Sequence, residues 1–143
     1  MKSEATVFSQ SRHIIFKEEI DILEAEQLMR ELITSIGKEL SYNEVILGHI
    51  KILAKLLQPV AEHFLFLSLT RLDQVDIVPS ECWPKEGDIS LDRLELYVNV
   101  LVFGHTMCKV EKVVNDALKG LGGSVYRMRV SDFNSRIGRG INL

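Results

Sequence analysis

Hydrophobic residues recur at helical spacing in two segments of the chain, which predicts two amphipathic helices. The first helix is expected over about 22–36. Asp21 precedes Glu24 at the spacing of a capping box, and Gly37 stands where a left-handed cap would end the helix. The apolar face of this helix comprises Ile22, Ala25, Met29, Leu32, Ile33 and Ile36. The second helix is expected over 107–119, with a buried stripe of Met107, Val110, Val113, Val114, Ala117, Leu118 and Leu121.

Elsewhere apolar residues alternate with polar ones, or β-branched and aromatic residues cluster, which is typical of strands. The predicted strands cover 12–16, 64–72, 94–103 and 125–130. In the strand from Phe64, one face carries Phe64, Phe66, Ser68 and Thr70. Four leucines, at positions 65, 67, 69 and 72, lie on or near the other face and are expected to be buried.

Residues 43–57 fit two interpretations. As a helix, Ser41 and Glu44 form a capping box, and a polar stripe runs ahead of Pro59. As a strand, one face carries Ile46, Gly48, Ile50, Ile52 and Ala54, and the other carries His49, Lys51 and Lys55. We favour the strand, because β-branched residues cluster here and Gly48 would weaken the interior of a helix.

The predicted order is therefore β-α-β-β-β-α-β, with 58–63 as a hairpin loop and 79–90 as an irregular, acid-rich loop. Two helices with one apolar face each, together with half-polar strands, predict an α+β fold. We expect a two-layer sandwich of a mainly antiparallel sheet and two amphipathic helices. A ferredoxin-like arrangement with an extra strand fits this order by analogy. Residues 1–123 are expected to form a single domain, followed by a basic C-terminal strand or tail over 124–143.

Composition narrows the class of protein. The chain has 143 residues, of which 46% are hydrophobic and 26% charged, as is usual for a soluble globular domain. Its net charge of −3 gives the whole molecule no electrostatic attraction to nucleic acid or to an anionic membrane. The sequence starts without an apolar leader, holds no run of membrane-spanning length and has two cysteines. We therefore expect a cytoplasmic protein with reduced thiols and no membrane partner.

The charge is unevenly distributed, because the C-terminal tail is basic. It carries Asp132 and four arginines, Arg127, Arg129, Arg136 and Arg139. The interpretation that we favour is a solubilising tail, or one that docks on an acidic surface. A phosphate or nucleic-acid contact is the alternative, because Tyr126 and Phe133 are interleaved with the arginines.

The main candidate site is the turn that separates the strand over 94–103 from the second helix. Thr106 is expected to be the N-cap, and helix N-termini present free N–H groups that attract anions. Gly104 would let a ligand approach the backbone closely, and His105 could add a hydrogen-bond donor. A small anion is therefore a candidate ligand here. The simpler interpretation is a structural turn with a capped helix.

Cys108 lies in the first turn of the second helix and points away from the predicted apolar stripe, so we expect it to be exposed. A thiol at this position, beside Lys109, is where a lowered pKa is expected, with His105 as the nearest base. A metal site of His49, His105 and Cys108 would require the fold to bring them together. The simpler interpretation is an inert or interfacial thiol and solvated histidines.

Trp83 is the sole tryptophan and stands in the irregular loop, where it can cover the core or anchor a partner. The nominally polar face of the strand over 43–57 also carries Leu47, Leu53 and Leu57, an apolar surface that something must cover. We therefore predict a binding or interaction module that forms a homodimer, with its ligand and any cofactor unidentified. A thiol- or metal-dependent enzyme, or a nucleic-acid contact through the tail, is the alternative.

Overall fold

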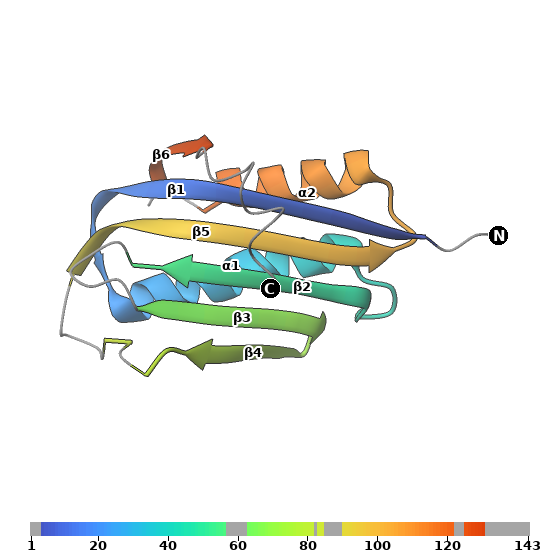
Figure 1. The fold of residues 1–143 in the computed structure, drawn as a ribbon, viewed down its shortest axis with the longest axis horizontal. Helices are drawn as coiled ribbons and strands as arrows, with labels where there is room; N and C mark the ends of the chain where they lie inside the picture. Colours follow the sequence, from blue (N-terminus) through green and yellow to red (C-terminus); the bar gives the residue numbers. More distant parts are fainter. Residues whose placement is uncertain (1–3, 57–62, 82, 85–89, 122–124, 131–143) are drawn as a thin grey trace.

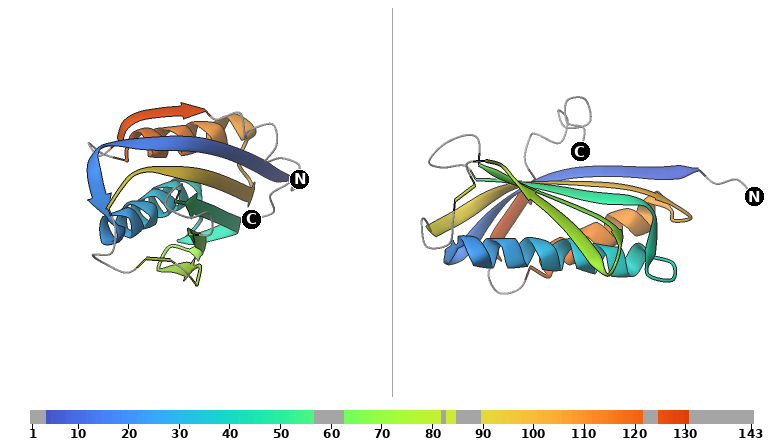
Figure 2. Two further views of the ribbon diagram at one scale, coloured as in Figure 1. Left: turned by 60° about the vertical axis from the view of Figure 1, so that its left-hand side comes forward. Right: turned by 90° about the horizontal axis from the view of Figure 1, so that it is seen from below.

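The computed structural model describes residues 4–56, 63–81, 83–84, 90–121 and 125–130. The chain forms β1 (Ala5–Asp21), α1 (Ile22–Leu40), β2 (Val45–Lys55), β3 (Phe64–Arg71), β4 (Gln74–Pro79), β5 (Ser90–Phe103), α2 (Met107–Lys119) and β6 (Val125–Val130). The six strands form one sheet in the order β4-β3-β2-β5-β1-β6 (Figure 1). All neighbouring strands are antiparallel. Both helices cover the same face of this sheet (Figure 2). The predicted α+β sandwich is therefore confirmed.

The topology consists of two interlocked split β-α-β units. β1 and β2 are joined by α1 and lie on either side of β5, while β5 and β6 are joined by α2 and lie on either side of β1. This is the ferredoxin-like arrangement. The hairpin of β3 and β4 extends it beyond β2, at one edge of the sheet.

The core lies between the helices and one face of the sheet. Alternate residues of the strands are buried there, such as Ile50 and Ile52 in β2 and Val98 and Val100 in β5. Arg12 in β1 faces the same way, since its guanidinium donates to Asn115 Oδ1 of α2 at 2.9 Å. The intervening side chains point to the other side of the sheet, which we call the helix-free face.

The segment with two interpretations, 43–57, is a strand, as we favoured, and its buried positions are those expected. The capping box of α1 is also confirmed, because Glu24 N donates to Asp21 Oδ1 at 2.8 Å and Asp21 N donates to Glu24 Oε1 at 3.1 Å. α2 has the predicted bounds and ends at Gly120.

Gly37 does not end α1, contrary to the prediction. The helix continues to Leu40, and Gly37 is buried within it. A Cβ at this position would collide with Leu69 Cδ2 and lie 3.1 Å from Leu72 Cδ2. The glycine therefore allows α1 to approach β3 closely. Its role is in helix–sheet packing, which local sequence signals do not reveal.

Three further expectations need correction. Met107 was placed in the buried stripe of α2, but its side chain is 47% exposed. The first strand is much longer than 12–16, because β1 pairs along most of β5. β4 was not predicted at all. Its Val75 and Ile77 are only partly buried against the core, and the strand is defined by its pairing with β3. The predicted hairpin loop at 58–63 falls almost wholly outside the described residues.

Within the described part of the chain, neither helix is long and apolar enough to cross a membrane.

Candidate functional site

The predicted turn at Gly104–Thr106 is fixed by contacts to α1, to β1 and to Tyr42, which lies between α1 and β2. Its His105 ring stacks on the Tyr42 ring, with centroids 5.1 Å apart and an interplanar angle of 13°. His105 Nε2 donates to the carbonyl oxygen of Leu40 at 2.9 Å, at the end of α1. Thr6 Oγ1 of β1 donates to the carbonyl oxygen of His105 at 2.5 Å. These contacts fasten the turn to α1 and β1.

Gly104 and Thr106 also have structural partners. Gly104 has a φ of 86°, and its carbonyl oxygen accepts a hydrogen bond from Tyr42 Oη at 3.0 Å. Thr106 caps α2 as expected, because its Oγ1 accepts from Lys109 N at 3.1 Å. The geometry thus accounts for all three residues through folding alone. Anion binding at this turn stays a prediction.

Cys108 is exposed, in agreement with the helical pattern, and is a free thiol. Trp83 lies elsewhere, where its Nε1 donates to Glu26 Oε2 of α1 at 2.9 Å and its ring packs partly on the core. Glu26 and Leu40 are separated by about 20 Å along the helix axis. Trp83 and the His105 turn therefore lie at opposite ends of α1, and the fold does not bring these candidate residues together.

His49 is also separate from His105. It projects from the helix-free face, opposite Leu101 of β5, whereas His105 contacts the end of α1 on the other side. Burial lowers the pKa of His49, and the nearby charge of Lys51 lowers it further. Among the described residues, no group of three or more histidine, cysteine, aspartate or glutamate side chains could hold a metal ion.

The helix-free face contains a polar network centred on Glu95 in β5. Glu95 lies between Lys55 of β2 and His13 of β1 in the strand register. Its Oε2 is 3.1 Å from His13 Nε2, and its Oε1 is 3.9 Å from Lys55 Nζ. Tyr97 Oη donates to Oε1 at 2.8 Å. Only 5% of Glu95 is exposed, so a buried carboxylate is balanced by donors from three adjacent strands.

This network holds the Tyr97 phenol in its neutral form. Burial raises the pKa of Tyr97 well above 10.0, and the hydrogen bond and negative charge of Glu95 raise it further. A phenolate at this position would lose the hydrogen bond and face the carboxylate directly. Tyr97 therefore acts as a hydrogen-bond donor that fixes the carboxylate.

One of the three tyrosines is expected to stay protonated well above pH 10 in the folded protein. Because the folded state holds this proton more tightly than the unfolded chain, the stabilisation is complete below about pH 10 and is lost as the pH rises further. A spectrophotometric titration of phenolate absorbance tests this, with Tyr97→Phe as the control that should remove the late step. Ionisation of all three tyrosines near pH 10 without unfolding would contradict the prediction.

Near one end of the helix-free face lies a group of apolar side chains that we call the apolar patch: Val7, Leu47, Leu101 and Phe103. Val7 pairs directly with Leu101, and Ala5 pairs with Phe103. Val7 is 52% exposed, Leu47 47% and Phe103 36%. Gly48 pairs with Val102, so the register of β2 places Leu47 beside Phe103, and the patch spans β1, β5 and β2. Leu47 was expected on an exposed apolar surface, whereas the other members were not predicted, because only the strand order brings them together.

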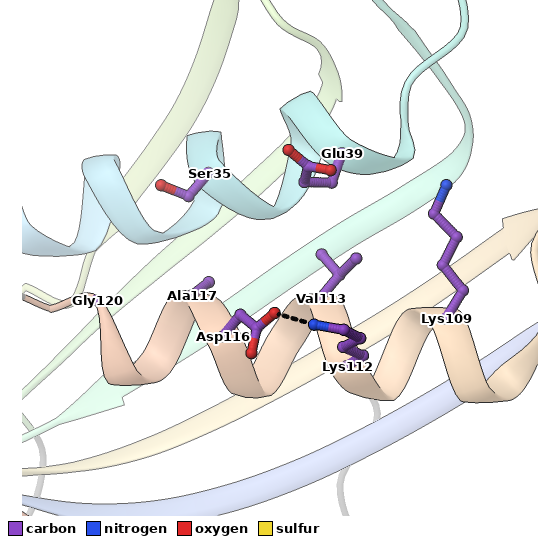
Figure 3. Close-up of a pocket in the computed structure, with 8 residues that line it drawn as sticks. All are labelled: Ser35, Glu39, Lys109, Lys112, Val113, Asp116, Ala117 and Gly120. Carbon is purple, nitrogen blue, oxygen red and sulfur yellow. Dashed lines mark hydrogen bonds and ion pairs between the residues drawn. The ribbon is translucent and has the colours of Figure 1, made fainter.

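A groove of about 560 Å³ runs between α1 and α2 on the opposite side of the molecule. Ser35 and Glu39 of α1 face Val113 and Ala117 of α2 across it (Figure 3). Lys112 Nζ and Asp116 Oδ2 form an ion pair of 2.8 Å along α2. The groove is lined by exposed side chains of both charges, so it lacks the buried apolar lining of most ligand pockets.

Comparison of the chain with protein-family models, curated proteins and solved structures finds no match.

Proposed function

We propose that the protein is a binding module whose interaction surface is the helix-free face of the sheet. The apolar patch is the observation that carries this proposal. Both described helices cover the other face, so Val7, Leu47 and Phe103 extend towards solvent from the rigid strands of a sheet. A continuous apolar surface of this kind is typical of an interaction site rather than of scattered surface residues.

The polar network supports the same surface. Glu95 and its donors lie on the helix-free face, beyond the apolar patch along β5. Their positions are fixed by neighbouring strands, so the face combines an apolar end with preorganised polar groups. Glu95 and Tyr97 are buried, so the network serves this surface by holding β1, β5 and β2 in register beside the apolar patch.

The alternative enzyme hypotheses gain nothing from this geometry. The thiol version requires a base for Cys108, but the ring of His105 stacks on Tyr42 and bonds to Leu40. The metal version requires His49 beside His105, and these two side chains lie on different sides of the sheet. A nucleic-acid contact through the tail stays a prediction, because Arg127 and Arg129 lie in β6 whereas Arg136 and Arg139 lie outside the described residues.

Replacing Leu47 with glutamate is expected to weaken binding of the fluorescent probe anilinonaphthalene sulfonate to the protein. Losing one apolar contact and adding a charge costs about 1 kcal/mol, or a roughly fivefold weaker affinity. The measurement is a fluorescence titration at low protein concentration. Leu23→Glu is a matched control, because Leu23 is also 47% exposed but lies on α1. Equal loss in both variants, or none in Leu47→Glu, would refute the proposed surface.

A further inference from the structure

We infer that residues 131–143 of this chain lie across the helix-free face, over the end that holds Ser11, Glu95 and Tyr97. This inference goes beyond the proposed function and does not depend on it, because it concerns the end of the face away from the apolar patch. Three observations support it: the burial of this end, the direction in which burial decreases across the sheet, and the point from which the segment starts.

One end of the helix-free face is buried, although both described helices lie on the other side of the sheet (Figure 2). Ser11 is 0% exposed, Tyr97 4% and Glu95 5%. Val7 lies four residues before Ser11 in β1 and points to the same side, yet it is 52% exposed. A sheet face without helices is normally open to water, as Val7 is. Something therefore covers this end of the face and leaves the apolar patch open.

The burial decreases from β1 towards β4. One row of paired residues crosses the sheet through Tyr97, whose partners are Ser11 in β1 and Leu53 in β2. The row continues through Phe66 in β3 to Val78 in β4. Along it, Ser11 and Tyr97 are buried, Leu53 and Phe66 are half-buried, and Val78 is 57% exposed. The covering segment therefore reaches the face from the β6 side of the sheet.

Residues 131–143 start at that side. β6 ends at Val130, which pairs with Arg12, and β6 runs antiparallel to β1, so the chain leaves β6 beside Ser11. These 13 residues span about 40 Å when extended, whereas β6 and β2 are about 15 Å apart across the sheet. The segment 57–62 is less suited, because it joins β2 to β3 and would cover those strands first.

The segment also carries suitable side chains. Phe133, Ile137 and Ile141 recur at intervals of four residues. Beneath them would lie the Tyr97 ring and the half-buried Leu53. Contact between these groups removes apolar surface from water on both sides, which is the driving force for such docking.

The test is hydroxyl-radical footprinting of the full chain, which oxidises side chains according to their exposure and is read by mass spectrometry. The variant Phe133→Ser/Ile137→Ser/Ile141→Ser weakens the proposed contact and keeps the length of the chain. In this variant we expect the oxidation rate of Tyr97, which is 4% exposed in the wild type, to rise up to about tenfold, towards that of Tyr42, which is 44% exposed.

A matched control and a second measurement also use the full chain. Asn134→Ser/Asn142→Ser replaces polar residues of the same segment and should leave the Tyr97 oxidation rate unchanged. If circular dichroism shows that the triple variant does not fold, a spin label on Ser135→Cys decides instead, with both native cysteines replaced by serine. We expect it to broaden the amide signal of Tyr97 in β5 and to leave that of Glu31 on α1 sharp.

Three results would overturn the inference. The first is a folded triple variant in which Tyr97 is oxidised as slowly as in the wild type. The second is a rise in Tyr97 oxidation in Leu57→Ser but not in the triple variant, which would identify 57–62 as the cover. The third is equal broadening of the Tyr97 and Glu31 signals. None of these results involves dye binding, so the proposed surface around Leu47 is tested separately.

Discussion

Replacing Gly48 with alanine is expected to lower the free energy of unfolding by about 4 kcal/mol, or to prevent folding. Gly48 has a φ of 129°, a conformation that residues with a Cβ rarely adopt. An added Cβ would lie 2.8 Å from the carbonyl carbon of Leu101 and 3.0 Å from Val102 Cα. These are backbone atoms of a paired strand, so no side-chain rotation can relieve the clash. Strain and collision therefore add at one position.

Urea denaturation measures the loss, and Gly120→Ala provides the control. Gly120 has a φ of −83°, and an added Cβ would lie 3.4 Å from the nearest atom, Asp116 O. This substitution should change stability by less than about 1 kcal/mol. If Gly48→Ala lowered the free energy of unfolding as little as Gly120→Ala, Gly48 would need neither its positive φ nor its close approach to the backbone of β5.

Replacing Glu95 with alanine is expected to lower the free energy of unfolding by about 3 kcal/mol. The substitution leaves the Tyr97 hydroxyl without its acceptor and removes the negative charge beside His13 and Lys55. It also leaves a cavity beside Tyr97, which lies on the same side of β5 as Glu95. The loss is therefore larger than that of a single exposed ion pair.

Tyr97→Phe tests whether the network is the cause. It removes only one hydroxyl, so we expect a loss of about 1 kcal/mol. In the double variant Glu95→Ala/Tyr97→Phe, the two losses should not add, because both substitutions remove the same hydrogen bond. Glu95→Gln retains an acceptor for Tyr97 and should be milder than alanine. All variants are compared at one protein concentration. Simple additivity would contradict the network.

Much of the secondary structure follows from local signals in the sequence. The capping box at Asp21 and the helix pattern over 107–119 each involve residues within a few positions of one another. Such periodicity depends on the geometry of a single element, so it can be recognised without the fold. The exceptions depended on distant residues. Gly37 packs on Leu69, and β4 is defined by its pairing with β3.

The polar network around Glu95 depends still more on residues that are far apart in the sequence. His13 and Glu95 are 82 positions apart, and no spacing in the sequence relates them. They meet because β5 lies between β1 and β2, which aligns His13, Glu95 and Lys55 in one row. The residues singled out from the sequence, Gly104 to Thr106, are adjacent in the chain. In the structure their contacts fasten this turn to α1 and β1.

The sequence by itself determined both helices, most of the strands and the two-layer class of this protein, since amphipathic periodicity specifies which face of each element is buried. It also determined that the helix around Cys108 exposes that thiol. Only the tertiary structure decided which strands are neighbours. That order assembled the Glu95 network and the apolar patch on the helix-free face. The physical reason is that strand pairing is a long-range interaction, whereas helix and strand patterns are local.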